Sequence, residues 1–210
     1  MPFPVEIALF SVCLSAAALL FAFWALYAPV KRFFYKHRTV KAYYKKVYQV
    51  ALDGDYYLIN DFSNKTAGEE EFHVDHILIG NKFIYCIRDR YYDGAVVATQ
   101  HNKAWIFYKK QKATYVPNPL LKNRVRVERL SLMGDTDPRI FVSVVLINDD
   151  CFITPFETDG SYQEYVVSLR QLPRLIRDLE SDPDVPFLDE TQIAVAARDY
   201  AELNLSGKRQ

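Results

Sequence analysis

The feature that most constrains this chain is a run of 24 uncharged residues between Glu6 and Lys31, IALFSVCLSAAALLFAFWALYAPV. As a helix, a run of this length extends about 36 Å, and the hydrocarbon core of a bilayer is about 30 Å thick. Trp24 and Tyr27 lie near one end of the run, where amphipathic rings favour the membrane interface. We therefore expect a retained single-pass transmembrane helix.

A cleaved signal peptide is the alternative interpretation of this run. The residues before it carry no positive charge, the run is too long, and no small-residue cleavage site precedes the bulky residues that follow. Pro29 closes the run, so we expect residues 1–30 to form a transmembrane anchor. The small residues SAAA at 15–18 offer a surface for contact with another helix, which is a weak signal.

A basic segment follows the apolar run. Residues 31–46 hold seven Lys or Arg residues and no acid, whereas only Glu6 is charged on the other side of the run. The positive-inside rule then predicts that residues 31–210 lie in the cytoplasm and that the N-terminus lies outside. We expect this juxtamembrane neck, together with the span at 7–30, to contact membrane lipid, because cationic segments are attracted to anionic headgroups.

The zero net charge of the chain averages very different blocks. Residues 103–129 hold eight basic residues and one acid, and residues 149–210 hold thirteen acids against six basic residues. The three cysteines, Cys13, Cys86 and Cys151, are odd in number and widely spaced, so they predict neither a disulfide framework nor a structural zinc site. Free thiols are typical of a reducing compartment.

Hydrophobic periodicity predicts an ordered succession of helices and strands after the neck. Helices are expected at 40–52, 120–133, 169–181 and after Pro186, with Asn118 and Asp189 as caps; strands are expected at 55–62, 72–80, 82–90, 95–100, 104–108, 139–147 and at YVVS. This order favours an α/β fold with a mixed β-sheet flanked by helices.

The stretch FIYCIRDR at 83–90 has the composition of a buried strand, yet it carries an arginine two residues after a free thiol. Because side chains alternate between the two faces of a strand, Cys86 and Arg88 project from the same face. Whether the chain is an enzyme depends on why this pair is there.

The stretch VDHILI at 74–79 precedes FIYCIR at 83–88, and VPNPLLKNRVRVERL follows at 116–130. Gly94 follows an aromatic loop, and Trp105 lies in the next expected hairpin. In this order the segments resemble the nuclease-related domain (NERD) family of the restriction-endonuclease-like superfamily, which implies that fold over residues 40–205. The resemblance includes the family's Ile-Asp-His strand, its strand ending in Glu-x-Lys and its Asn-Pro-Leu-x-Gln helix start. The expected domain layout is therefore an anchor, a neck and a NERD-like α/β domain at 47–205.

In the family pattern, the active site around a divalent metal consists of an Asp, a Glu-x-Lys, a Glu from the first helix and a Gln from the later helix. Asp75 matches the Asp, Cys86 stands at the Glu position, and Arg88 stands at the Lys position. Lys122 stands at the Gln position, and the first helix, KAYYKKVYQVAL, holds no acid. The resemblance therefore implies a degenerate catalytic site.

These substitutions weaken the chemistry of a metal nuclease. Mg²⁺ prefers several hard oxygen ligands, whereas a thiol is soft and suits other metals. Arg88 stays protonated and cannot act as a base, but it can form a forked pair with Asp75 or with a phosphate. We therefore predict that Arg88 pairs with Asp75 and fills the place of a cation, and we expect no cofactor.

A rearranged active site is the alternative, because active carboxylates migrate within this superfamily. The acids close to Asp75 in sequence are Glu69, Glu70, Glu71, Asp89 and Asp93. If the site is active, Asp75 is the metal ligand and Mg²⁺ or Mn²⁺ is the cofactor. A zinc site of His73, Asp75 and Cys86 is a further candidate, but we favour a structural, hydrogen-bonded role for the neighbouring His76.

The expected helix at 120–133 has a strongly basic face. The candidate nucleic-acid-binding residues are Lys109, Lys110, Lys112, Lys122, Arg124, Arg126 and Arg129, which would contact phosphates as one patch. The alternative is a solvated helix face that the acidic C-terminal part of the chain neutralises.

The sequence therefore predicts a membrane-anchored cytoplasmic domain that is catalytically inactive and binds nucleic acid, a protein partner or both. The alternative is a membrane-tethered, metal-dependent nuclease with a rearranged active site. A cluster of carboxylates facing Asp75 in the folded domain would favour the alternative, whereas the residues at positions 86, 88 and 122 favour the binding module.

Overall fold

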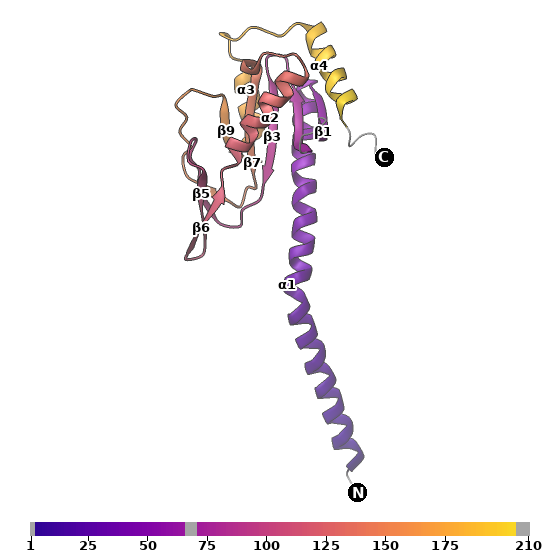
Figure 1. Ribbon diagram of the computed structural model, residues 1–210. Coiled ribbons are helices and arrows are strands. Elements are labelled where there is room, and N and C mark those ends of the chain that lie inside the picture. The colour runs from indigo at the N-terminus through magenta and orange to yellow at the C-terminus, as the bar shows by residue number, and fades with distance from the viewer. Residues whose placement is uncertain (1–2, 66–70, 205–210) are drawn as a thin grey trace. The chain divides into compact units, whose positions relative to one another are not determined.

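The computed structural model describes residues 3–65 and 71–204, with only the backbone described for residues 3–11, 13 and 24–39 (Figure 1). The chain divides into two compact units, residues 1–42 and 43–210. A single helix, α1 (Phe3–Gly54), contributes to both of them. Separate helices at 7–30 and 40–52 were expected, but the helix continues through Pro29, since one proline removes only one intrahelical hydrogen bond.

The apolar run of the first unit is described only in part. In the part of the chain that the structure describes, no helix has a stretch long and apolar enough to cross a bilayer. Most side chains of the expected span at 7–30, including those of Trp24 and Tyr27, and those of neck residues 31–39 lie outside the described part of the chain.

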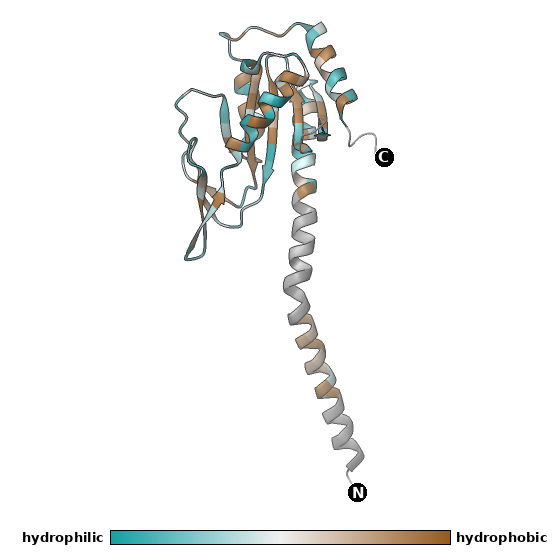
Figure 2. Ribbon diagram, viewed as in Figure 1, coloured by the Kyte–Doolittle hydropathy of each residue, from teal (hydrophilic) through white to brown (hydrophobic). Residues whose placement is uncertain are grey.

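The second unit is built on a five-stranded mixed sheet with the order β1-β2-β3-β7-β9. The strands are β1 (Tyr57–Asn64), β2 (Phe72–Ile79), β3 (Ile84–Arg90), β7 (Phe141–Ile147) and β9 (Glu164–Ser168). The first three strands are antiparallel, whereas β7 is parallel to both β3 and β9. Every residue of β7 is buried, as its β-branched sequence predicts for a strand covered on both faces (Figure 2).

Helices cover both faces of this sheet, which confirms the expected α/β class. The C-terminal part of α1 and α3 (Leu172–Glu180) pack on one face with Leu78, Tyr85 and Ile87. Helices α2 (Pro119–Met133) and α4 (Glu190–Leu203) pack on the other face with Ile77 and Cys86. The two faces thus alternate residue by residue along β2 and β3, which is why neighbouring polar residues on these strands have different surroundings.

A smaller four-stranded sheet has the order β6-β5-β4-β8. Its strands are β4 (Ala95–Val97), β5 (Ala104–Lys109), β6 (Lys112–Pro117) and β8 (Phe152–Ile153). Strand β6 was not predicted, because five of its six residues are exposed and only pairing with β5 holds it. A Cβ on Gly94 would collide with the carbonyl oxygen of Tyr108, so the approach of these segments requires glycine there.

Helix α2 begins at the predicted cap. The Asn118 side-chain oxygen accepts a hydrogen bond from the backbone N–H of Leu120, and Pro119 occupies the first turn. The Asn118 amide also donates to the carbonyl oxygens of Thr99, Gln100 and Asn102. These contacts replace the end of the strand expected at 95–100. Asp189 precedes α4 as predicted, but its side chain makes no capping hydrogen bond.

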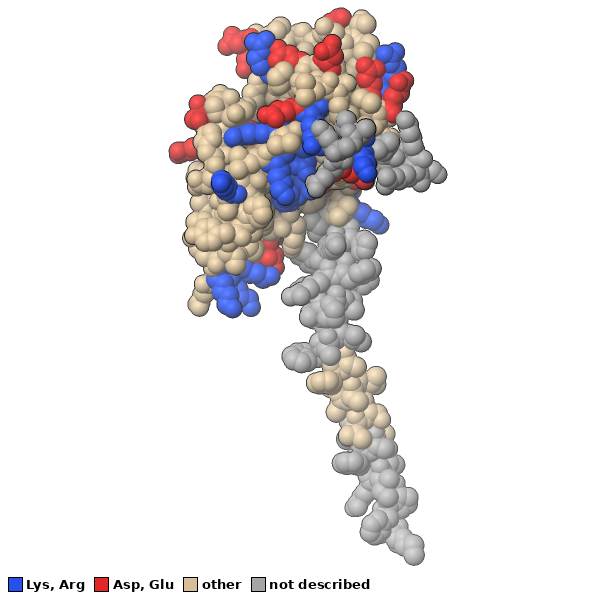
Figure 3. All heavy atoms as spheres, in the orientation of Figure 1, with Lys and Arg blue, Asp and Glu red and all other residues tan. Residues whose placement is uncertain are grey.

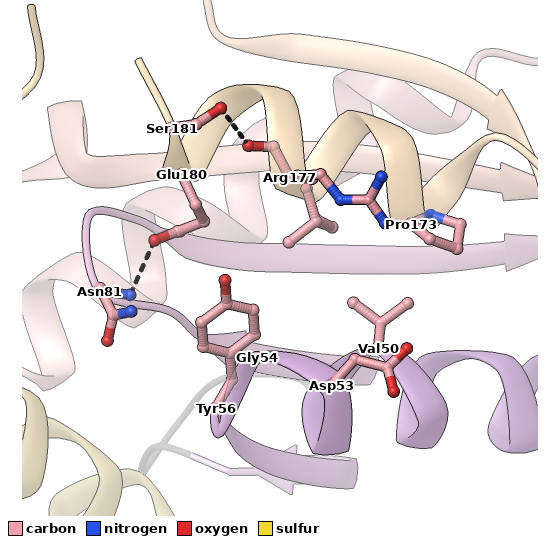
Figure 4. A pocket seen from close by; sticks show the side chains of 10 residues that line it. Val50, Asp53, Gly54, Tyr56, Asn81, Pro173, Arg177, Glu180 and Ser181 are labelled. Carbon is pink, nitrogen blue, oxygen red and sulfur yellow. Dashed lines mark hydrogen bonds between the residues drawn. The ribbon is translucent and has the colours of Figure 1, made fainter. Parts of the chain in front are cut away.

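A pocket of about 310 Å³ lies where the end of α1, the β2–β3 turn and α3 meet (Figure 4). Glu180 projects into this region from α3 and accepts hydrogen bonds from the backbone N–H groups of Asn81 and Lys82. Its other carboxylate oxygen accepts a hydrogen bond from the Tyr85 hydroxyl at 2.6 Å. Glu180 therefore fixes the β2–β3 turn, which sets the register of the two strands that carry Asp75 and Arg88.

Candidate functional site

Asp75 and Arg88 face each other across β2 and β3. The register continues from the pair His76 and Ile87, so Asp75 and Arg88 are the next opposed residues on the face that α2 covers. Arg88 Nη1 donates to Asp75 Oδ1 at 2.9 Å, and both side chains are less than one-fifth exposed. The contact predicted from the sequence is therefore present.

Asp75 has two further partners. Its Oδ2 accepts a hydrogen bond from the backbone N–H of Asp89 at 2.9 Å, and its Oδ1 lies 3.1 Å from His73 Nε2. Burial alone would raise the pKa of Asp75, but the His73 hydrogen bond, the charge of Arg88 and the Asp89 N–H together lower it. Asp75 is therefore a carboxylate whose oxygens already have protein partners.

Cys86 is fully buried beneath α2. Its Sγ lies 3.7 Å from Asn123 Oδ1, and its carbonyl oxygen accepts a hydrogen bond from Asn123 Nδ2 at 2.9 Å. Burial raises the pKa of the Cys86 thiol to about 12. Since the thiolate is the form that binds metals and attacks electrophiles, Cys86 is a packed, inert thiol at neutral pH. Asn123 was not singled out from the sequence, because its inward direction depends on how α2 is rotated.

The basic residues of α2 have different surroundings. Arg126 reaches over β2, and its Nε donates to the carbonyl oxygen of His73 at 2.5 Å. The guanidinium of Arg129 lies 5.4 Å from the centre of the Phe72 ring. Lys122 is exposed one turn before Arg126, and the structure gives it no contact with Asp75. Figure 3 shows Lys and Arg side chains gathered on the face of the domain over α2.

Arg124 points away from this group and is bound within the fold. Its Nε and Nη2 donate to the two carboxylate oxygens of Glu164 at 2.6 and 2.8 Å, and its guanidinium lies over the Tyr162 ring. The Glu164 side chain is 1% exposed. For this residue the neutralising acid lies in the C-terminal part of the chain, as the alternative interpretation of the basic helix stated. The Arg124 guanidinium therefore balances the charge of the buried Glu164 carboxylate within the fold.

The structure does not bring the hairpin lysines and the α2 cations together. Lys109 lies opposite Lys112 in the β5–β6 ladder, beside the turn that holds Lys110. Pro117, at the other end of β6, leads into α2. The length of that strand, about 20 Å, separates the two groups of charges. The Lys109 side chain also forms an ion pair with Asp93. The predicted single patch therefore consists of two separate groups.

A second polar group lies on the opposite face of the same strands. His76 is fully buried, its Nδ1 lies 2.6 Å from Asn60 Oδ1, and its Nε2 lies 3.1 Å from Asp89 Oδ2. The Tyr44 ring from α1 meets the His76 ring edge-on at 4.8 Å. These contacts agree with the structural role expected for His76, whereas Asn60 and Tyr44 were missed because nothing in the sequence pairs them with it.

The side chains present do not fit a magnesium or zinc site. Among the side chains that the structure describes, no three His, Cys, Asp or Glu residues form a group able to hold a metal ion. Asp75 is paired with Arg88, Asp89 lies on the opposite face, and Asp93 is paired with Lys109. Glu71 is exposed, and Glu69 and Glu70 lie outside the described residues.

Comparison with known proteins identifies one family. The family model described as "NERD: Nuclease-related domain" matches residues 37–148, which is just over half of the chain. The match includes all of β2, β3, β7 and α2, but neither the apolar run nor α3 and α4. No curated protein and no solved structure matches.

Proposed function

The chain belongs to the nuclease-related domain family, and we propose that its α/β domain binds its target without cleaving it. The observation that carries this proposal is the ion pair between Asp75 and Arg88, with Nη1 and Oδ1 2.9 Å apart. Asp75 is the one carboxylate of the family pattern that this chain retains, and the cationic side chain of Arg88 is bound to it.

The electrostatics of this pair oppose metal-dependent hydrolysis. A divalent cation beside Asp75 would lie within a few ångströms of the Arg88 guanidinium, which remains protonated. Mg²⁺ also needs several oxygen ligands to replace the water it gives up, and the buried thiol of Cys86 supplies none. The same guanidinium is well suited to binding an anion, because its planar fork matches carboxylate and phosphate groups.

The proposal includes a membrane location. The 24 uncharged residues before Lys31 are long enough to span a bilayer, and the basic neck at 31–46 would then face the cytoplasm and rest on anionic lipid. In this arrangement the binding module works beside a membrane, and its target is a nucleic acid or a cytoplasmic protein.

One observation favours the second candidate function, a metal-dependent nuclease with a rearranged site. Asp89 Oδ1 is buried and has no hydrogen-bond partner among the described residues. An unpaired buried carboxylate oxygen one position from Arg88 is a free ligand position. To reach Asp75, this carboxylate would have to move to the opposite face of β3, and the hydrogen bond between His76 and Asp89 opposes that change.

A cleavage assay separates the two functions. We would incubate the full chain in detergent with single- and double-stranded DNA and RNA, with Mg²⁺ or Mn²⁺, beside the variant Asp75→Ala. The binding module predicts no cleavage by either protein, while the chain retains a cooperative unfolding transition. Metal-dependent cleavage that disappears in Asp75→Ala would overturn the proposal in favour of the rearranged nuclease.

A further inference from the structure

Three arginines lie close together on the α2 face of β3. Arg88 and Arg90 are two residues apart on one strand and therefore project from the same face. Arg126 enters from α2 and donates to the carbonyl oxygen of His73 on the neighbouring strand. Burial, followed by the charge of Arg88, lowers the pKa of both Arg90 and Arg126, which indicates that the three guanidinium groups share one electrostatic environment. We call Arg88, Arg90 and Arg126 the arginine triad.

The arginine triad has few acidic partners within the described part of the chain. Arg88 is paired with Asp75, whereas neither Arg90 nor Arg126 has a carboxylate within ion-pair distance there. Arg90 Nη1 donates to the backbone oxygen of Asp89, and Arg126 donates to a backbone oxygen as well. Carbonyl oxygens satisfy a donor but do not neutralise a charge, so the triad carries excess positive charge.

The triad also has unused hydrogen-bond donors. Arg88 Nε is buried and has no partner among the described residues. A guanidinium presents five N–H donors, and for Arg90 and Arg126 the structure assigns one nitrogen each. All three side chains remain partly exposed, so a ligand can reach them from solvent. A half-buried group of cations with few acidic partners is poorly stabilised by the protein alone.

We propose that the arginine triad binds one phosphate group, with Asp75 holding Arg88 in position. The inference rests on the proposed function, because it names the chemistry by which a non-cleaving module recognises its target. A phosphate group supplies the negative charge that the triad lacks and at least two acceptor oxygens for its donors. Asp75 is the positioning residue, since its hydrogen bond with Nη1 fixes the direction of the Arg88 guanidinium, which is still partly exposed.

Phosphate groups with this chemistry occur in a nucleic-acid backbone, in a phospholipid headgroup and as free inorganic phosphate. All three present anionic oxygens that can accept hydrogen bonds from guanidinium groups. The length of the adjacent basic face favours a nucleic acid, because Lys122 precedes Arg126 by one helical turn and would contact a second phosphate.

The test is a titration of the full chain in detergent with inorganic phosphate, followed by thermal unfolding, at constant ionic strength set with chloride. The variants are Arg126→Gln and Arg90→Gln. The matched control is Arg174→Gln, which removes an exposed arginine from α3 on the opposite face of the sheet. We expect each triad variant to weaken apparent phosphate affinity about tenfold or more, since each removes a charge-assisted hydrogen bond, while the control binds as the wild type does.

A second readout separates ligand binding from a structural role. In phosphate-free buffer, Arg126→Gln is expected to unfold at the same temperature as the wild type or at a higher one, because it removes a desolvated like charge. Lower stability in phosphate-free buffer together with unchanged phosphate affinity would overturn the inference. If Arg126→Gln does not fold, Arg90→Gln decides the same question.

Competition then identifies the source of the phosphate. A short oligonucleotide and a short-chain phosphatidic acid are each titrated against bound phosphate, with Arg126→Gln as the reference. Displacement that depends on Arg126 supports the site for whichever competitor causes it. If the chain cleaves nothing and the triad substitutions change the binding of no phosphate compound, the inference fails. A protein-binding function would still stand. Metal-dependent cleavage would instead overturn the proposed function, and the triad variants would still decide the phosphate site.

Discussion

At the scale of single residues, the face of the sheet on which an aspartate lies decides the direction of its pKa shift. Asp75 and Asp89, fourteen residues apart, lie on opposite faces. Asp75 faces α2, and its partners lower its pKa; the largest of these effects is the His73 hydrogen bond, followed by the charge of Arg88. Asp89 faces α1, where burial raises its pKa despite the hydrogen bond with His76. The two carboxylates therefore make opposite contributions to stability at neutral pH.

The variants Asp75→Asn and Asp89→Asn test this difference. The folded-state pKa of Asp75 lies below its ordinary value of 3.8, so its charge stabilises the fold above that pH, and this contribution is lost as the pH falls through the folded pKa. We expect Asp75→Asn to lower the free energy of unfolding at pH 7 by about 1–3 kcal/mol, because Arg88 loses its ionic partner.

For Asp89 the sign is reversed, because a raised pKa means that ionisation costs stability above the ordinary value of 3.8. Asp89→Asn should therefore cost less than Asp75→Asn at pH 7 or should stabilise the fold. Denaturant unfolding of both variants at pH 7 and in acid gives the comparison. Equal losses at pH 7 would contradict the assignment of the two faces.

At the scale of elements, α2 is the part of the structure that assembles the site. Its start is tied to the smaller sheet through Asn118, its middle touches Cys86 through Asn123, and Arg126 crosses to β2. Asn123, Arg124 and Arg126 thus have a buried role, an ion-paired role and a proposed ligand-binding role, respectively. The basic face read from the sequence is divided among these roles because a helix turns 100° per residue.

We predict that Asn118→Ala lowers the free energy of unfolding by about 2 kcal/mol or more, because it removes the cap of α2 and also the amide that donates to the carbonyl oxygens of Thr99, Gln100 and Asn102. Asn102→Ala is the control, since the exposed Asn102 contributes only its backbone oxygen to this group. The measurement is chemical denaturation of both variants. If the two substitutions cost the same, α2 is not held by this residue.

At the scale of the whole molecule, the proposed arrangement places a phosphate-binding domain after a membrane anchor. The domain carries its candidate site between two antiparallel strands and one helix, within the residues that the family model matches. The proposed anchor at 7–30 precedes that match. The binding module and its location are therefore separate hypotheses that different measurements test.

The anchor is tested by alkaline extraction of membranes from cells that express the full chain. We expect the wild-type chain to stay in the membrane fraction, and the double variant Leu19→Arg/Leu20→Arg to be released, since each arginine near the centre of a span costs about 2.5–3.5 kcal/mol. Protease added from the cytoplasmic side should remove residues 31–210. Release of the wild-type chain by alkali would refute the anchor.

The sequence by itself determined the α/β class, the order of most elements and the family, because hydrophobic periodicity and short motifs are local properties of the chain. It also predicted that Cys86 and Arg88 share one strand face, since alternation along a strand is independent of the rest of the fold. Only the tertiary structure paired Arg124 with Glu164, placed β6 beside β5 and separated the hairpin lysines from α2. These outcomes depend on contacts between residues far apart in sequence and on the rotation of α2, which no local pattern encodes.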